Sequence, residues 1–434
     1  MKSLCYNRYV GYDMFMPEGH KERKREMKKL LVVLLAVTMT FAMFGCTKEE
    51  EQKEEQTVTI WHTYTDDQKA YLEQAAADFN AAHEGEITVV VESQEYSGFD
   101  DTVYNAVMNG NGPDIIINYA STAALYVEDG KVADLSQYLS QDLIDALDEG
   151  AYKEATSFSD GKMHIFPIVF SGPVLFYNPE IFDAAGVTEV PTTWDGIYEA
   201  AEKVHAYNGK WGFAVDSLTD VAQTWIMQLG VTIFDTTTNT CAFDTEEVEA
   251  MFDWYGKAVQ DGLFLADPTL SNYFSDDYNN GNIACYIGSV AGAPYLTASW
   301  KVAPLPQIEG GVEWTPAWNR GVIVFSSNED KEAAACEFLT YFASAEVNAG
   351  WCVACNYQTS LSTTRETETY KNLMANSETL NALQPESAGS FDALPAIQYV
   401  RTALKNLMKD VAAGTDAKTA IGTAYDYVAG EIAQ

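Results

Sequence analysis

The sequence predicts an α/β protein of two lobes, and three observations lead to this prediction. Short apolar runs alternate with helical patterns, which is typical of a parallel sheet covered by helices. About 378 of the 434 residues follow an N-terminal leader and linker, too many for a single core. The apolar fraction of 47 % and the aromatic fraction of 12 % indicate a well-filled globular protein. We therefore expect two lobes, whose segments can be discontinuous in the sequence.

Residues 27–46, MKKLLVVLLAVTMTFAMFGC, have the order of an export signal that ends in a lipid-modified cysteine. Two lysines precede an uncharged run over 30–44, and small Gly45 precedes Cys46. The alternative, a transmembrane helix, needs roughly 20 apolar residues, whereas this run has 15. We expect residues 1–26 to be an upstream extension and residues 47–56 an acidic linker. The mature protein would then lie on the outer face of the cytoplasmic membrane, attached through lipid on Cys46.

The strands and helices can be placed in chain order from the apolar periodicity. Strands are expected at 58–61, 87–91 and 114–117, with helices at 67–79 and from about 100 to 108 between them. Further strands are expected at 172–178, 212–216, 283–287, 301–305 and 321–325. Helices are expected at 193–204, where the PTTWD turn supplies the cap, and at 246–260 and 331–342. From residue 345 the chain reads as mostly helical, without a repeat of fixed period.

The charge excludes some partners. The first 46 residues carry eight basic and four acidic residues, so the remainder carries 18 basic against 59 acidic, a net charge of −41. Such a surface repels phosphate backbones, which argues against a nucleic-acid partner. A neutral ligand fits this charge better than an acidic polymer.

The cysteines do not form an obvious framework. Beyond Cys5 and Cys46 the chain has five cysteines, an odd number that leaves at least one free thiol. Cys352 and Cys355 form a CxxC pair, which could be redox-active or half of a metal site. The alternative is that both are small apolar residues at a helix end, because no second CxxC or histidine pair completes four ligands. We expect no metal and no cofactor.

Several motifs together resemble a known family. In order they are TIWHTYTDD, NGNGPDIIINYASTAALYVEDGKVADLSQYL, IFPIVFSGPVLFYNPEIFDAAG, VPTTWDGIYEAAEKV, NNGNIACYIGS, WNRGVIVFS and LPAIQYVRTAL. They resemble the substrate-binding proteins of bacterial sugar ABC importers, in the style of the maltose-binding and glycerol-3-phosphate-binding proteins. The resemblance extends over residues 57–434.

This resemblance implies a fold of the periplasmic-binding-protein type II, with a ligand held between two hinged lobes. The N-terminal lobe is expected at 57–168 and 295–343, and the C-terminal lobe at 169–294 and 344–434. The chain is expected to cross between them at 167–173, 288–294 and 343–349. Independently, ligands of open α/β sheets bind beyond the carboxyl ends of the strands, which favours the INYAS segment after the strand at 114–117.

Candidate ligand contacts follow from the chemistry of sugars and from the resemblance. A sugar presents hydroxyl groups around weakly apolar faces, so its site needs planar rings and hydrogen-bonding groups. Trp225 and Trp318 are the expected stacking residues, with ordinary core packing as the alternative for each. The other expected contacts, implied by the resemblance, are His62, Tyr64, Tyr96, Tyr119, Ser121, Ser171, Ser289, Asn319, Gly321, Tyr357 and Gln398.

Departures from the family patterns bear on the ligand. Ala120 replaces the acidic residue, and Gln398 the phosphate-pairing arginine, of the glycerol-3-phosphate-binding proteins, although Arg401 lies three residues on. Loss of a bidentate guanidinium removes a strong phosphate contact. Ser121 and Thr122 replace the acidic and arginine pair of the maltose-binding pattern. We therefore expect a carbohydrate other than maltose, with a glycerol phosphate or polyol as the alternative.

An enzyme and an adhesin are the alternatives to an importer component. A secreted carbohydrate-active enzyme needs two suitably spaced carboxylates, and chance pairs are abundant among 59 acidic residues. The chain lacks HExxH, GxSxG and GxxxxGK[ST], so we expect no enzyme. A surface adhesin that kept the fold is a further alternative. The expected partners are a carbohydrate, the membrane permease subunits and the membrane itself, with the protein a monomer.

Overall fold

The computed structural model describes residues 55–266, 273–384, 388–389 and 396–433. The expected export signal, Cys46 and all but the end of the acidic linker lie outside the described residues. Within the described ranges, no helix is both long enough and apolar enough to cross a membrane.

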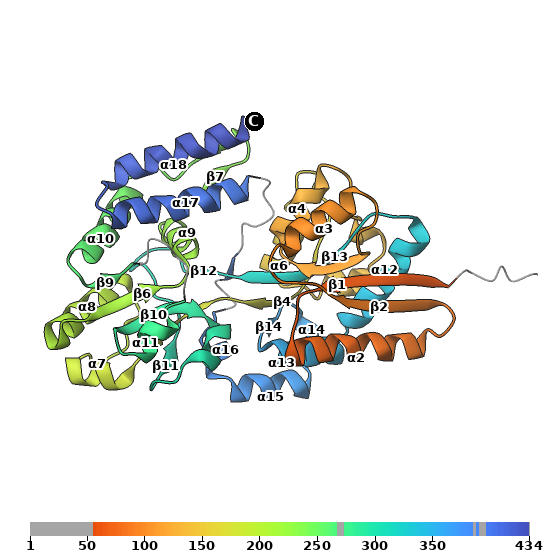
Figure 1. Cartoon of the computed structure of the whole chain (residues 1–434), viewed down its shortest axis with the longest axis horizontal. Coiled ribbons are helices and arrows are strands. Elements are labelled where there is room, and N and C mark those ends of the chain that lie inside the picture. The colour runs from red at the N-terminus through yellow and green to blue at the C-terminus, as the bar shows by residue number, and fades with distance from the viewer. Residues whose placement is uncertain (1–54, 267–272, 385–387, 390–395, 434) are drawn as a thin grey trace, which may run out of the picture. The chain divides into compact units, whose positions relative to one another are not determined.

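The first lobe is built on a six-stranded sheet. Its order is β14 (Gln358–Thr359), β4 (Phe166–Ser171), β13 (Trp318–Val324), β3 (Ile115–Asn118), β1 (Gln56–His62) and β2 (Ile87–Ser93). Strands β1, β2 and β3 are parallel, whereas β13 runs antiparallel to both β3 and β4. The carboxyl ends of the three parallel strands therefore lie at the same edge of the sheet as the start of β13 (Figure 1).

Helices cover this sheet because each turns an apolar stripe toward it. In α2, for example, Leu72, Ala75, Ala76 and Phe79 are buried at helical spacing. The helical segments of the first lobe are α2 (Asp66–Ala82), α3 (Phe99–Met108), α4 (Ala120–Val127), η1 (Leu135–Gln137), α5 (Gln141–Ile144), α6 (Glu149–Ala155), α12 (Glu329–Phe342), α13 (Ala345–Cys355), α14 (Ser362–Arg365) and α15 (Glu368–Asn376).

The second lobe is built on a five-stranded sheet with its own core. Its order is β11 (Lys301–Ala303), β5 (Pro173–Tyr177), β10 (Ile283–Ser289), β6 (Trp211–Val215) and β9 (Phe264–Leu265). Strands β6, β9 and β10 are parallel, and β5 is antiparallel to β10 and β11. A separate cluster of buried apolar residues runs from Leu175 to Val428.

Long helices cover the second sheet, and α17 and α18 lie side by side (Figure 1). Thr193 caps α8 by accepting the Gly196 amide at 3.1 Å, as the PTTWD motif predicted. The remaining elements are α7 (Pro179–Ala185), α8 (Trp194–Asn208), α9 (Leu218–Gln228), β7 (Phe234–Asp235), β8 (Thr240–Cys241), α10 (Glu246–Gln260), α11 (Ser275–Asn279), η2 (Val290–Tyr295), β12 (Thr315–Pro316), α16 (Glu378–Ala382), β15 (Ala388–Gly389), α17 (Ile397–Ala412) and α18 (Ala417–Ile432).

The predicted α/β class and the two lobes are confirmed, but two segments belong to the other lobe than expected. Residues 345–370 pack into the first core, with Trp351 and Cys352 fully buried there. Lys301–Ala303 pairs with β5 in the second sheet. The prediction was wrong here because helices of either lobe have the same amphipathic pattern, so periodicity alone cannot tell which sheet a helix covers.

The chain crosses between the sheets three times. The first crossing is Gly172, between β4 and β5, inside the predicted range. The second lies between β11 and β13 and the third between α15 and α17, both later in the sequence than predicted. The three crossings meet at Gly172, where an added Cβ would be 2.9 Å from the Pro316 carbonyl oxygen and 3.1 Å from Leu383.

The five cysteines of the described residues are buried free thiols. Cys352 and Cys355 lie on α13 within the first core. The structure therefore favours the apolar alternative for this CxxC pair.

Candidate ligand-binding site

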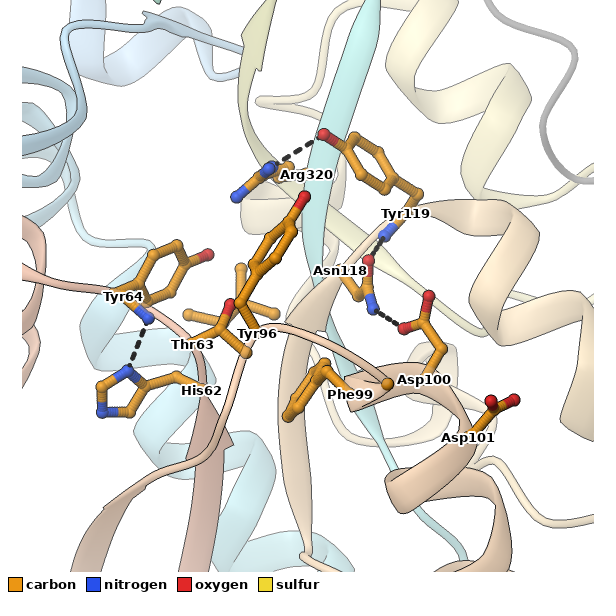
Figure 2. A pocket seen from close by; sticks show the side chains of 12 residues that line it. His62, Thr63, Tyr64, Tyr96, Phe99, Asp100, Asp101, Asn118, Tyr119 and Arg320 are labelled. Atoms are coloured by element: carbon orange, nitrogen blue, oxygen red, sulfur yellow. Dashed lines mark hydrogen bonds between the residues drawn. The ribbon is translucent and has the colours of Figure 1, made fainter. Parts of the chain in front are cut away.

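A cavity of about 410 Å³ opens at the edge of the first sheet where the parallel strands end. Its walls come from the end of β1, the segment after β2, the first turn of α3, the end of β3 and Arg320 on β13 (Figure 2). This volume is within the range of small-molecule sites, and the position beyond the strand ends is where open α/β sheets bind ligands.

His62 is the last residue of β1, Tyr64 follows two residues later, and both line this cavity. The Tyr64 backbone amide donates to Nδ1 of His62 at 3.0 Å, and the two rings stack with centroids 5.7 Å apart. Burial lowers the pKa of His62, and the nearby charge of Lys69 adds to this. A neutral imidazole that accepts at Nδ1 carries its proton on Nε2, which lies 3.3 Å from the Ser93 hydroxyl.

Arg320 lies among three tyrosines. Its Nε donates to the Tyr119 hydroxyl at 3.0 Å, and its guanidinium carbon is 5.0 Å from the Tyr119 ring centroid. The Tyr357 ring centroid is 5.9 Å away, a second cation–π contact. Tyr64 is 7 % exposed, and within the described ranges its hydroxyl makes no hydrogen bond.

The local backbone geometry of β13 directs the Arg320 side chain toward the cavity. The pairing of β13 with β4 shifts register between Arg320 and Gly321, which is the signature of a β-bulge. Gly321 faces the crowded side, where an added Cβ would lie 2.5 Å from Ile165 and 2.7 Å from the Phe166 carbonyl oxygen. A glycine is therefore needed beside the arginine.

The mouth of the cavity is polar. Asn118 donates to Asp100 at 2.9 Å and its side-chain oxygen accepts the Tyr119 amide at 2.9 Å, which fixes the turn after β3. Asp101 is exposed, and the Tyr96 side chain is 82 % exposed (Figure 2). A ring this exposed and adjacent to a cavity is free to cover a bound ligand.

The second lobe has a polar group at the equivalent place, the carboxyl end of a parallel strand. Asp216 follows β6 and accepts the Phe274 amide at 2.8 Å. Burial raises the pKa of Asp216 to about 6. Gly288 leaves room for this carboxylate, since an added Cβ there would lie 2.6 Å from Asp216 Oδ2.

Four of the residues predicted as ligand contacts line the cavity: His62, Tyr64, Tyr96 and Tyr119. Tyr357 lies beside Arg320 but is 8 % exposed. The others lie elsewhere. Ser121 is on α4, and Ser171 is the last residue of β4 and is 4 % exposed. Trp318 is half-buried and begins β13. Ser289 is the last residue of β10, and its hydroxyl accepts the Ala291 amide at 3.2 Å. Gln398 is exposed on α17.

Three expectations need correction. Trp225 is 0 % exposed and packs against Trp194 and Trp254, because its helix turns this face toward the second core. The Asn319 side chain donates to buried Glu154, on the opposite side of β13 from Arg320. Gly321 allows β13 to pack closely against Ile165 and Phe166. None of the three has a side chain available to a ligand at the cavity.

Arg320 and Asp216 were missed by the sequence analysis. The signal for Arg320 was present, since alternation along a strand places residue 320 on the face opposite Asn319. Asp216 is the last residue of the strand predicted at 212–216, and the carboxyl end of a strand is also a position typical of ligand groups. Within the described residues, no group of three or more His, Cys, Asp or Glu side chains could hold a metal ion.

Comparison with known proteins identifies the family. The model of the bacterial extracellular solute-binding protein family matches residues 74–378, so the chain belongs to this family. A binding protein of Brucella abortus is 25 % identical over 280 residues, covering 61 % of this chain and 66 % of that protein. The match thus spans just under two thirds of that relative's length.

Two further relatives are named after the ligands that they bind. The sn-glycerol-3-phosphate-binding periplasmic protein of Rhizobium meliloti is 23 % identical over 340 residues, 73 % of this chain and 77 % of the relative. The maltotriose-binding protein of Pyrococcus abyssi is 23 % identical over 296 residues, 66 % of this chain and 62 % of the relative.

Solved structures show the same fold. The cyclic alpha-maltosyl-1,6-maltose binding protein from Arthrobacter globiformis superposes with a TM-score of 0.77 at 19 % identity, over 86 % of this chain and 98 % of that one. The maltose-binding protein MalE from Listeria monocytogenes in complex with maltose gives 0.70 at 20 % identity, over 88 % and 98 %. The two-lobe type II fold implied by the sequence resemblance is therefore confirmed.

Proposed function

We propose that this protein is the extracytoplasmic substrate-binding component of an ABC importer and captures a carbohydrate between its two lobes. The observation that carries the proposal is the tyrosine-lined cavity at the carboxyl ends of β1, β2 and β3, in a chain of the solute-binding family. Aromatic rings with hydroxyl groups suit sugars, which present weakly apolar faces edged by hydroxyls.

Binding would act by shifting the lobes from an open to a closed arrangement. In this proposal ligand contacts Tyr64 and Tyr119 on the first lobe and Asp216 on the second, so only the closed form makes every contact. The meeting of the three crossings at Gly172 supports a hinge there. A 99:1 preference is reversed by about 5.5 kcal/mol of differential affinity, within reach of several hydrogen bonds and stacked rings.

The remaining parts of the proposal concern location and partners. Residues 27–46 would direct export, and lipid on Cys46 would hold the monomeric protein at the outer face of the membrane, where permease subunits recognise the closed form. Mass spectrometry of the N-terminal peptide from membrane fractions tests the anchor. A Cys46→Ala variant is expected to lose the lipid and appear in the soluble extracellular or periplasmic fraction.

A thermal-shift panel of mono- and oligosaccharides, polyols and glycerol phosphates tests the ligand class, since a tight ligand raises the melting temperature by mass action. Small-angle scattering with the best ligand should then show a smaller radius of gyration. Failure of every compound to shift the melting temperature would contradict the proposal. Release of products from a saccharide would instead favour an enzyme.

A further inference from the structure

Within the described residues, no acidic side chain forms an ion pair with Arg320. A guanidinium is protonated at all physiological pH values. Its guanidinium interacts with Tyr119, Tyr64 and Tyr357. Burial raises the pKa of Tyr64 and of Tyr357, so these hydroxyls stay neutral in the working range. In the part of the chain that the structure describes, the groups in contact with this half-buried cation are therefore uncharged.

The other arginines of the described residues provide an internal comparison. Arg365 donates to Asp148, with 2.7 Å between Nη1 and Oδ1, and Arg401 donates to Asp220 at 3.2 Å. For Arg320, no carboxylate in the described ranges lies within ion-pair distance. A partly buried charge without a counterion is costly. Arg320 thus differs from the two arginines that have a structural role.

The groups around Arg320 also offer more protons than acceptors. Four guanidinium N–H groups remain after Nε donates to Tyr119, and the Tyr119 hydroxyl, which accepts there, still has its own proton. The Tyr64 hydroxyl is buried, unpartnered among the described residues, and lies on the Arg320 side of the cavity (Figure 2). A sugar hydroxyl both donates and accepts, whereas a carboxylate or phosphate oxygen only accepts. This cluster therefore complements an acceptor-only group.

Opposing charges are present but farther from the cluster. Asp100 is held by Asn118 at the mouth, and Asp101 is exposed. Together with the net charge of the surface they slow the approach of an anion. Salt screens such exposed charges beyond about 8 Å, while a direct contact inside the cavity is screened much less. A direct contact between an anionic group and Arg320 would therefore be weakened less by salt than the repulsion from these exposed carboxylates.

We propose that the ligand presents an anionic oxygen group to Arg320, so that this site takes an acidic saccharide in preference to its neutral counterpart. The inference rests on the proposed carbohydrate-binding function and names the ligand class within it. The anionic group can be the carboxylate of a uronic acid or a phosphate ester, because both offer paired acceptor oxygens to the guanidinium edge.

Isothermal titration of the full chain with matched ligand pairs tests the inference. One arm pairs oligosaccharides of galacturonate and glucuronate with their methyl esters, and the other pairs glucose 6-phosphate with glucose. We expect the acid of one arm to bind at least 10-fold more tightly than its neutral partner, and the arm that shows this identifies the group. Arg320→Gln should weaken the acid by about 10- to 100-fold and leave the neutral compound nearly unchanged.

Two variants serve as comparisons. Arg320→Lys keeps the charge but loses the planar fork, so it should retain part of the acid preference. Arg401→Gln removes an equal charge outside the cavity and should leave the preference intact. Equal affinity for acid and neutral partner, or an unchanged ratio in Arg320→Gln, overturns the inference while the carbohydrate function stands. Absence of binding by every saccharide, acidic and neutral, overturns the proposed function itself.

Discussion

The imidazole Nδ1 of His62 accepts the backbone amide of Tyr64 at 3.0 Å, which joins a titratable group to the geometry of the cavity. The bond exists only while Nδ1 is unprotonated. Burial lowers the pKa of His62 in the folded protein, with Lys69 as the second cause. The unfolded chain, with a histidine pKa of about 6.5, takes up this proton more readily.

Stability should therefore depend on pH through His62. Its stabilising contribution is fully present above about pH 6.5 and is lost as the pH falls through the lower folded pKa. His62→Asn supplies an amide oxygen as acceptor and does not titrate. Between pH 7 and pH 5, differential scanning calorimetry should show the wild type losing about 2 °C more than this variant. Equal losses would show that His62 does not titrate in this range.

Trp225 should be a stability residue. Trp225→Ala removes the centre of a ring cluster in the second core and should cost about 3–5 kcal/mol in denaturant unfolding. Trp225→Phe should cost much less, because it keeps most of the volume and removes an indole N–H that has no hydrogen-bond partner in the described ranges. Ligand affinity of Trp225→Phe should equal that of the wild type. A 10-fold loss of ligand affinity in Trp225→Phe with an unchanged melting temperature would instead show that Trp225 contacts the ligand.

The fold could be predicted from the sequence more completely than the site. Helix 246–260 and the strand at 172–178 were placed within a residue or two, because their periodicity and caps are local. Lobe membership of 345–370 depends on tertiary packing, which periodicity does not contain. The burial of Trp225 on α9 and the partial exposure of Trp318 at the start of β13 likewise depend on tertiary packing. Alternation along the strand separates Arg320 from Asn319, but which of these two faces meets a ligand depends on how β13 packs in its sheet.

Gly172 should be intolerant of a side chain. An added Cβ would lie 2.9 Å from the Pro316 carbonyl oxygen, so Gly172→Ala should destabilise by about 1–3 kcal/mol. Gly422 is the matched control, because it lies on α18 and an added Cβ meets nothing within 4 Å. Gly422→Ala should stabilise by about 0.5–1 kcal/mol through helix propensity. Equal effects in urea unfolding would contradict the close packing of the crossings.

The buried thiols should be inert in the native protein. Burial raises the pKa of Cys241 to about 11 and that of Cys336 to about 12, which leaves almost no thiolate at neutral pH. A thiol reagent should therefore label none of the cysteines beyond residue 54 until denaturant is added. Oxidised glutathione should leave the melting temperature unchanged. Rapid native labelling of Cys352 or Cys355 would revive the redox interpretation of the CxxC pair.

The charged Asp216 carboxylate should lower the stability of the folded protein and raise its affinity for the ligand. Its folded pKa of about 6 exceeds the unfolded value of about 3.9, so the energetic cost of its charge is fully present above about pH 6 and absent below about pH 4. Asp216→Asn keeps an acceptor for the Phe274 amide and removes the charge. The variant should be more stable than the wild type by on the order of 2 kcal/mol at pH 7.5, and about equal at pH 4.

The ligand affinity of Asp216→Asn at pH 7.5 should fall, because a neutral amide accepts sugar hydroxyls less strongly than a carboxylate. Calorimetric unfolding and titration of the same samples measure both effects, and a variant less stable at both pH values would show that the carboxylate has a structural role instead.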